Sequence, residues 1–284
     1  MLEIVPSVCY FARMIRGFIG VIHLPPMPGD PKATKETTFD SVVQHALIDG
    51  RVLLAGGVDA IVVENFGSAP FAKGDAGSRL PPHQVALMTR VVEAMVREAE
   101  CPVGVNCLRN DVRSALGIAA ATGARFVRVN VHTGAYVTDQ GLIEGEAHRT
   151  LRYRRELGAD DVAILADVLV KHAEPLVAVD PTTATEDTVK RGLADGVIVT
   201  GRATGEPVDE KLLEEVSAAA GEASVLIGSG LSLENCPSLA PYVDGAIVGT
   251  ALKQDGQLFA PVDVDRVRAM GELLANHLRS RSSS

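Results

Sequence analysis

Two carboxylates, a lysine and a histidine in this sequence have the types and positions needed for acid–base chemistry. Glu64 ends the apolar run AIVVE, and Asp167 lies in the run VAILADVLV, which Lys171 and His172 follow. Glu64 and Asp167 could act as acid and base at a carbon beside a carbonyl group, or could ligate a divalent metal with a histidine. Lys171 could instead form a Schiff base if burial or Arg128 lowers its pKa. The sequence leaves these three chemistries open.

Other apolar runs also end in polar side chains of the kind that bind a substrate. They contribute His23, Asn65, Asn106, Arg128, Asn130 and Thr200. A buried Arg128 needs either a counter-charge or a bound anion, and Asp167 could supply the counter-charge in an internal ion pair. We favour a substrate site, because six runs rather than one end in polar groups.

Small-residue turns follow the last two apolar runs. They contain Gly228, Ser229 and Gly230 in IGSGL, and Gly249 and Thr250 in IVGTALK. Such residues let backbone N–H groups approach an anion closely. We therefore predict a phosphate site at these turns, completed by a helix that begins near Leu233. Lys253 could add positive charge there or could face the solvent.

The fold must bring the ends of eight Val- and Ile-rich runs together. The runs span 17–24, 59–65, 102–108, 125–132, 162–170, 195–201, 224–230 and 244–250. Runs of this kind are typical of strands buried on both faces of a parallel sheet. Eight of them, with helical segments between, predict an α/β fold, a single (β/α)8 TIM barrel of the phosphate-binding type. An open doubly wound sheet is the alternative, but no GxGxxG follows the first run.

Helical spacing is found between the predicted strands, and two long segments lack it. Helices are predicted within 39–57, 84–100, 111–124, 185–194, 209–222 and 262–278. The segments 65–84 and 132–150 are long and contain Gly, so we expect loops that cover a small-molecule site. Oligomer contacts or mobile excursions are the alternatives. We expect an N-terminal extension or cap at 1–16, the barrel at 17–278 and a disordered Ser-rich tail at 279–284.

Composition excludes several classes of protein. The net charge of −9 and an aromatic content of 4% argue against nucleic-acid binding. No apolar stretch reaches the roughly 18 residues of a membrane span. The four cysteines form no CxxC pair, so neither a zinc site nor a disulfide framework is expected. Reduced cysteines indicate a cytoplasmic protein.

Long motifs in the chain resemble those of the BtpA/SgcQ family. The resemblance covers about residues 14–275 and rests on GVIHLPPMPG, VVENFGSAPF, RVNVHTGAYVTDQGLIEG, LADVLVKHA, DGVIVTGRATG, IGSGL and DGAIVGT. It implies a TIM barrel of the ribulose-phosphate-binding type. The matching positions are His23, Glu64, Asn65, Asn106, Asn130, Asp167, Lys171, His172, Thr200 and Gly201.

The resemblance implies two different kinds of function. Members that accompany sugar-metabolism genes suggest an isomerase, epimerase or lyase that acts on a phosphorylated sugar. The family's link to photosystem I biogenesis suggests instead an assembly factor for a membrane complex, and nucleoside or ribose-phosphate processing is a third alternative. We favour the enzyme, with a small phosphorylated metabolite as its partner, no required cofactor, an optional divalent metal and a homo-oligomeric state.

Overall fold

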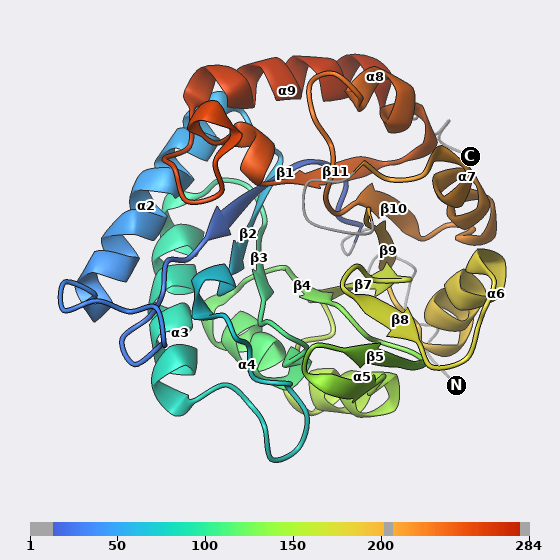
Figure 1. Cartoon of the computed structure of the whole chain (residues 1–284), viewed down its shortest axis with the longest axis horizontal. Helices are drawn as coiled ribbons and strands as arrows, with labels where there is room; N and C mark the ends of the chain where they lie inside the picture. Colours follow the sequence, from blue (N-terminus) through green and yellow to red (C-terminus); the bar gives the residue numbers. More distant parts are fainter. Residues whose placement is uncertain (1–13, 202–206, 279–284) are drawn as a thin grey trace, which may run out of the picture.

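Eight parallel strands form a closed barrel with helices packed around its outside (Figure 1). The structure is a computed structural model that describes residues 14–201 and 207–278. The barrel strands are β1 (Gly17–His23), β2 (Ala60–Glu64), β3 (Val103–Asn106), β4 (Phe126–Val129), β7 (Ala163–Val168), β9 (Gly196–Val199), β10 (Ser224–Ile227) and β11 (Gly245–Val248). Their order around the barrel is β1-β11-β10-β9-β7-β4-β3-β2. The predicted TIM barrel is confirmed.

The helices follow the strands around the ring. They are α2 (Phe39–Gly56), α3 (Pro82–Glu98), α4 (Val112–Thr122), α5 (Ala147–Glu156), α6 (Pro181–Glu186), α7 (Glu210–Ala219), α8 (Cys236–Leu239) and α9 (Val264–His277). Short 3₁₀ turns are η1 (Phe66–Ser68), η3 (Ala240–Tyr242), η4 (Thr250–Leu252) and η5 (Gln254–Gly256), and η2 (Asp187–Arg191) is a π turn. Within the described ranges, no helix combines the length and apolar character needed to cross a bilayer.

Two sequence predictions fall outside the described residues. These are residues 1–13 of the expected N-terminal extension and the expected tail at 279–284. The division of the chain into cap, barrel and tail therefore stays a prediction.

Helix boundaries follow from local chemistry in the sequence. Thr38 and Ser41 form a reciprocal capping box at the start of α2, and the Asp111 side chain accepts from the Ser114 N–H at the start of α4. Gly57 ends α2 with a φ of 88°, a conformation that glycine adopts without steric cost. These caps satisfy backbone groups that a helix end would otherwise leave unpaired.

The inside of the barrel has an apolar layer below a polar one. The apolar cluster is made by alternate residues of the strands: Ile19, Val21, Ala60, Val62, Phe126, Ala163, Leu165, Ile198, Leu226 and Ile247, with Ile15 before β1. Side chains alternate along a strand, so the next inward position on each strand lies one layer higher. Those next positions are His23, Glu64, Arg128, Asp167, Thr200, Gly228 and Gly249. These seven predicted site residues thus form one layer at the carboxyl ends of the strands.

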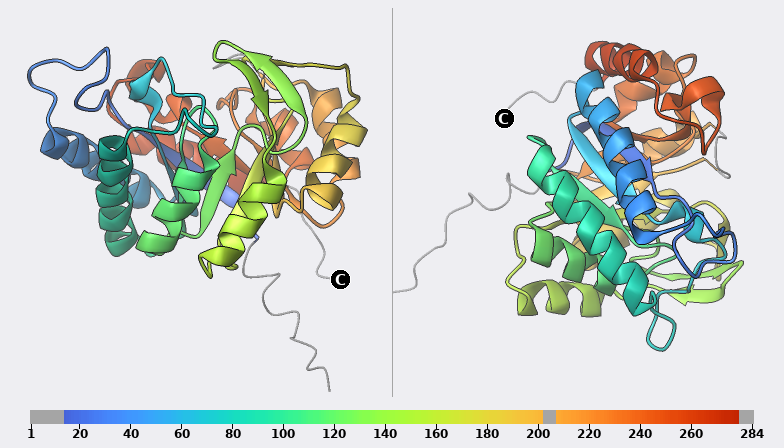
Figure 2. Two further views of the ribbon diagram at one scale, coloured as in Figure 1. Left: turned by 90° about the horizontal axis from the view of Figure 1, so that it is seen from below. Right: turned by 90° about the vertical axis from the view of Figure 1, so that its left-hand side faces the viewer.

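A small antiparallel sheet replaces part of one predicted loop. Strands β5 (Ala135–Thr138), β6 (Gly141–Glu144) and β8 (Ala173–Pro175) pair in the order β6-β5-β8. Figure 2 shows the β5–β6 hairpin at the same end of the barrel as the loop between β1 and α2. The prediction of a plain loop over 132–150 was wrong, because β5 pairs with β8, which lies far away in the sequence.

Two helical segments in the second half of the barrel begin at other residues than predicted. The helix expected over 185–194 is α6 followed by the π turn η2, and the helix expected near Leu233 is the four-residue α8, which begins at Cys236. Pro237 lies in the first turn of α8, where its missing N–H does no harm.

A buried ion pair joins the last βα loop to the first helix of the barrel. Lys253 has 1% of its surface exposed, and its Nζ donates to the Asp49 carboxylate in α2. Asp49 also accepts from the Val262 N–H at 3.3 Å. Lys253 therefore does not face solvent, and its charge is paired with the Asp49 carboxylate.

We predict that Lys253→Met destabilises the protein by about 3–5 kcal/mol, because it leaves the Asp49 carboxylate buried without its cation. Urea unfolding would measure the loss as a lower midpoint at an unchanged slope. Lys190→Met is the matched control, because the Lys190–Glu186 pair is exposed and we expect little change from its removal. Equal losses in the two variants would contradict the assigned role of the buried pair.

Candidate functional site

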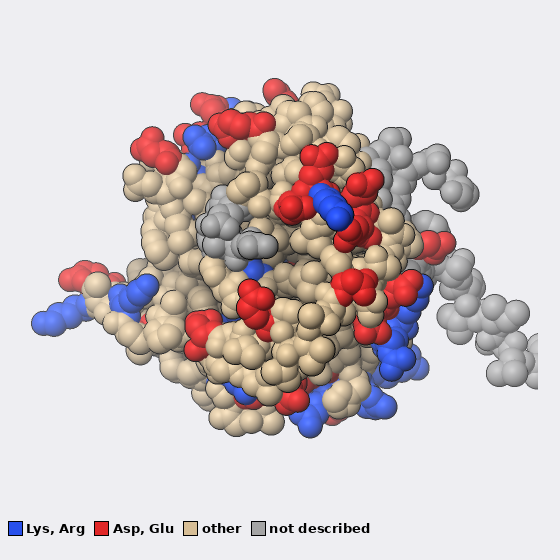
Figure 3. Space-filling model, turned by 45° about the vertical axis from the view of Figure 1, so that its right-hand side comes forward, with Lys and Arg blue, Asp and Glu red and all other residues tan. Residues whose placement is uncertain are grey.

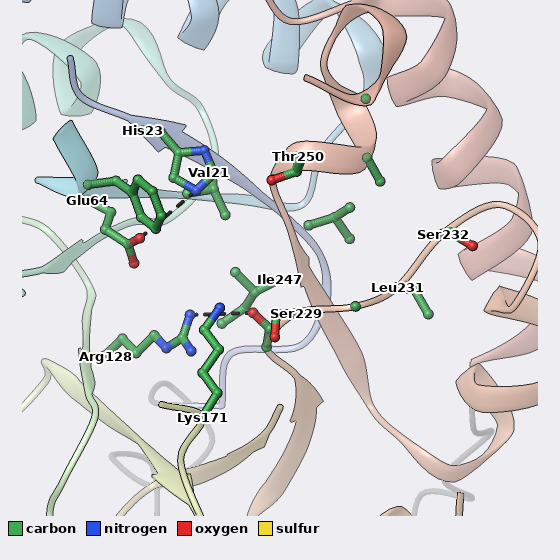
Figure 4. A pocket seen from close by; sticks show the side chains of 17 residues that line it. Val21, His23, Glu64, Arg128, Lys171, Ser229, Leu231, Ser232, Ile247 and Thr250 are labelled. Atoms are coloured by element: carbon green, nitrogen blue, oxygen red, sulfur yellow. Dashed lines mark hydrogen bonds and ion pairs between the residues drawn. The ribbon is translucent and has the colours of Figure 1, made fainter. Parts of the chain in front are cut away.

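A cavity of about 220 Å³ opens at the carboxyl ends of the barrel strands. Its wall combines the ends of β1, β2 and β4 with the turns after β10 and β11 (Figure 4). Figure 3 shows basic side-chain atoms at the bottom of a central hollow and acidic side chains on the surrounding surface. The predicted residues that line the cavity are His23, Glu64, Arg128, Lys171, Gly228, Ser229, Gly230, Gly249 and Thr250.

Asp167 holds Arg128 in a two-pronged ion pair at the floor of the site. Arg128 Nε and Nη2 lie 3.0 and 3.1 Å from the two Asp167 oxygens, and Asn130 Nδ2 donates to the second oxygen at 2.8 Å. All three side chains are buried. Such a geometry stabilises both charges without water. The internal ion pair considered from the sequence is therefore present, and it forms part of the cavity floor.

Lys171 is presented to the cavity by a constrained segment after β7. Its N–H donates to Thr200 Oγ1 at 3.1 Å, and its carbonyl accepts from Arg109 Nη2 at 2.7 Å. Leu169 and His172, two non-glycine residues, flank it with φ values of 51° and 54°. Backbone of this kind costs about 1–3 kcal/mol per residue and concentrates at functional sites.

The Lys171 ammonium group has no partner among the residues that the structure describes. Its Nζ forms no hydrogen bond and no ion pair there, and Figure 4 shows the side chain extending into the cavity toward the Arg128 guanidinium. Burial, and then the charge of Arg128, lowers the Lys171 pKa to about 8. At pH 7 about one molecule in ten therefore carries a neutral amine, a far larger fraction than for an exposed lysine.

Glu64 and His23 form the opposite wall. Asn106 Nδ2 donates to Glu64 Oε2, while Glu64 Oε1 lies 4.0 Å from His23 Nε2. The His23 ring packs at 5.0 Å from the Phe66 ring. One Glu64 oxygen is therefore fixed by an amide and the other points toward the cavity and the imidazole.

His23 is neutral over the physiological pH range. Burial, and then the nearby charges of Lys253 and Lys171, lowers its pKa to about 3. Its Nδ1 is buried and lacks a partner among the described atoms. A Cβ on Gly249 would lie 2.5 Å from His23 Cε1, so a glycine is required for the ring to lie against this turn. A neutral imidazole of this kind can donate a hydrogen bond to a substrate oxygen.

The turns after β10 and β11 present small residues to the same cavity. Gly230 has a φ of 81°, and the buried Ser229 Oγ has no partner in the described part of the chain. A Cβ on Gly228 would lie 2.3 Å from Ile198 Cγ2 and 3.2 Å from Arg128 Nη2. Glycine at this position thus allows the turn to approach the arginine.

Several other predicted residues act on their neighbours instead of lining the cavity. Asn65 binds the backbone N–H and carbonyl of Leu108 at 2.7 and 3.2 Å, Asn106 orients Glu64, and Thr200 binds the Lys171 backbone. His172 is exposed and lies immediately before β8.

Two residues outside the predicted set also shape the site. Arg109, which follows β3, fixes the Lys171 backbone, and Phe66 packs on His23 and lines the cavity. Both follow strand ends, which is the only signal in the sequence that could have found them. The divalent-metal alternative lacks a ligand set, because the described residues bring no three His, Cys, Asp or Glu side chains together for a metal.

Sequence comparison places these residues in a family. The chain matches the BtpA family over residues 14–276. This protein belongs to the BtpA family. The photosystem I biogenesis protein BtpA of Synechocystis sp. is 48% identical over 265 residues, which cover 93% of this chain and 90% of that protein. An uncharacterized protein of Pyrococcus furiosus is 43% identical, over 89% and 92% of the two chains. The family predicted from the motifs is confirmed.

Solved structures confirm the fold of this BtpA-family chain. The phosphoribosyl anthranilate isomerase of Thermococcus kodakaraensis superposes with a TM-score of 0.52 at 15% identity, over 92% of this chain and all of that one. At this identity, the likeness concerns the barrel alone.

We predict that Asp167→Asn lowers the free energy of unfolding by about 3–5 kcal/mol, because it leaves the buried Arg128 guanidinium without a counter-charge. Thermal or urea unfolding would measure this loss. Asp161→Asn is the matched control, because Asp161 pairs with Arg125 at the exposed surface and its loss should change stability little. A stable Asp167→Asn variant would refute the role given to this pair.

Proposed function

We propose that this BtpA-family protein is an enzyme that binds a small phosphorylated carbonyl metabolite, such as a sugar phosphate, and moves a proton beside the carbonyl group. Isomerases, epimerases and lyases share this step. The observation that carries the proposal is the half-buried Lys171 ammonium group, which has no partner in residues 14–201 and 207–278 and faces the Glu64–His23 pair across one cavity. A largely desolvated cation without a counter-ion among these residues favours an anionic or electrophilic ligand.

The turns after β10 and β11 would hold the phosphate. In TIM barrels this position commonly binds phosphate through backbone N–H groups. Ser229, Gly230 and Thr250 line the cavity there, beside the positive charges of Arg128 and Lys171. Arg128 already has Asp167 as a counter-ion, so Lys171 supplies the charge that a phosphate would neutralise.

Glu64 and His23 would carry out the proton transfer. In this proposal, the Glu64 oxygen that Asn106 leaves free removes the proton, and the neutral His23 ring donates to the carbonyl oxygen as negative charge develops on it. Asp167 orients Arg128 instead of acting as acid or base, because its two oxygens accept from Arg128 and Asn130. The sequence assigned the acid–base role to Asp167 as well as to Glu64.

Partner binding is a second candidate function, supported by an exposed apolar surface on the antiparallel sheet. Val137 and Leu142 are 51% and 39% exposed, and Leu176 and Val177, which follow β8, are 57% and 77% exposed. Apolar side chains exposed to this extent can form protein contacts. The name of the Synechocystis relative, a biogenesis protein, suits such a role, and the predicted homo-oligomer could use the same surface.

Sedimentation of the Val177→Asp variant would test whether this surface mediates association. Loss of association with phosphate binding intact would separate the two functions.

We predict that inorganic phosphate and ribulose 5-phosphate raise the melting temperature of the protein, and that their affinity falls as the pH rises above about 8. A ligand at 100 times its Kd adds about 2.7 kcal/mol of stability. The pH dependence follows because Lys171 is charged below its pKa of about 8 and neutral above it. Thermal shift measurements between pH 6.5 and 9.5 would record both effects.

Lys171→Met is expected to weaken phosphate binding several-fold and to remove this pH dependence. Lys190→Met, at an exposed position, should leave both unchanged. A folded wild-type protein whose melting temperature does not change with any phosphate would refute the phosphate site.

We also predict that the protein exchanges a proton of a bound ketose phosphate with solvent. Deuterium from the solvent should replace hydrogen on the carbon beside the carbonyl group, and Glu64→Gln should stop this exchange.

A further inference from the structure

We propose that Lys171 is a covalent catalyst that forms a Schiff base with the carbonyl group of the substrate. This inference rests on the proposed function and makes it more specific, because it selects ketones and aldehydes among phosphorylated metabolites. It distinguishes an enzyme that activates the carbonyl by bonding to it from one that only polarises it.

The environment of the Lys171 amine suits a nucleophile. A structural lysine is normally paired when buried, as Lys253 is with Asp49 in this same protein. Lys171 Nζ has no such partner in residues 14–201 and 207–278, and it reaches into the cavity. The cation beside it, Arg128, is held in place by Asp167. A neighbouring fixed cation and burial are the two conditions that keep a lysine amine neutral and reactive.

The backbone around Lys171 is built to position this side chain. Thr200 and Arg109 bind the N–H and the carbonyl of Lys171 itself, from the ends of two other strands. The two flanking residues with positive φ bend the chain on each side. A lysine that only attracted an anion would not require so fixed a backbone, because an ammonium group on a flexible side chain can bind a phosphate from many positions.

Glu64 and His23 can carry the protons of this reaction. The neutral Lys171 amine attacks the carbonyl carbon, a C–N bond forms as the C–O π bond breaks, and a proton passes from the nitrogen to the oxygen to give a neutral carbinolamine. A proton delivered by the protonated Glu64 carboxyl then lets that hydroxyl leave as water, which gives an iminium ion and a Glu64 carboxylate. Glu64 then removes the proton beside the iminium carbon to give an enamine, and reprotonation and addition of water release the product and the free amine. The sequence needs no oxidant or reductant.

Borohydride trapping would test the Schiff base. The full-length protein would be incubated with dihydroxyacetone phosphate, reduced with sodium borohydride, digested and mapped by mass spectrometry. We expect the peptide that contains Lys171 to gain the mass of the probe less one oxygen atom. At saturating probe, labelling should rise with pH through the Lys171 pKa of about 8 and level off about one pH unit above it, following the fraction of neutral amine.

Matched probes and variants make the failures distinguishable. Glycerol 3-phosphate, which lacks a carbonyl, should stabilise the protein without labelling it, and unphosphorylated dihydroxyacetone should label Lys171 more slowly. Lys171→Arg keeps the positive charge and should lose the label, while Lys190→Arg should keep the label.

Stabilisation by both phosphates without any label would overturn the Schiff base and leave the phosphate site in place. Labelling at Lys171 by both ketones at equal rates would keep the Schiff base and refute the phosphate site. No label from either ketone would overturn the Schiff base whatever the binding result.

Discussion

The ion pair between Asp167 and Arg128 is the constraint on which the rest of the site depends. It holds a charged guanidinium in the polar layer that lies directly above the apolar layer of the barrel, and it does so with the two carboxylate oxygens and the Asn130 amide. Without this neutralisation, desolvation would make the arginine unfavourable there. Once the guanidinium is fixed, every group that faces it experiences its charge, above all the amine of Lys171.

The charged side chains of the cavity differ in how they are held in place. Arg128 and Glu64 are held by side-chain partners, whereas Lys171, among the described residues, is held through its backbone. His23 stays neutral because burial, and then the charges of Lys253 and Lys171, outweigh the influence of the Asp49 carboxylate. The cavity therefore contains a carboxylate, a neutral imidazole and an amine whose charge changes near neutral pH, which is a set suited to chemistry beside a carbonyl group.

The cavity and the exposed apolar side chains of this BtpA-family protein lie on different parts of the fold. The cavity lies inside the barrel mouth, while the exposed apolar side chains belong to the sheet β6-β5-β8 and the segment after it. The two features use different residues, so binding of a metabolite and binding of a partner protein would not exclude each other. They would also respond to different substitutions.

The barrel, and the layer of it that holds the site, could be predicted from the pattern of residues along the chain. Eight Val- and Ile-rich runs give eight strands, and the two-residue period of a strand puts His23, Glu64, Arg128 and Asp167 above one apolar layer. Only the tertiary structure decided what each polar group does: Asn65 holds the Leu108 backbone, Asn106 orients Glu64, Lys253 joins Asp49, and β8 completes a separate sheet. The reason is physical. Periodicity is local and is written along the chain, whereas a buried polar side chain takes its role from partners that only folding brings within about 3 Å.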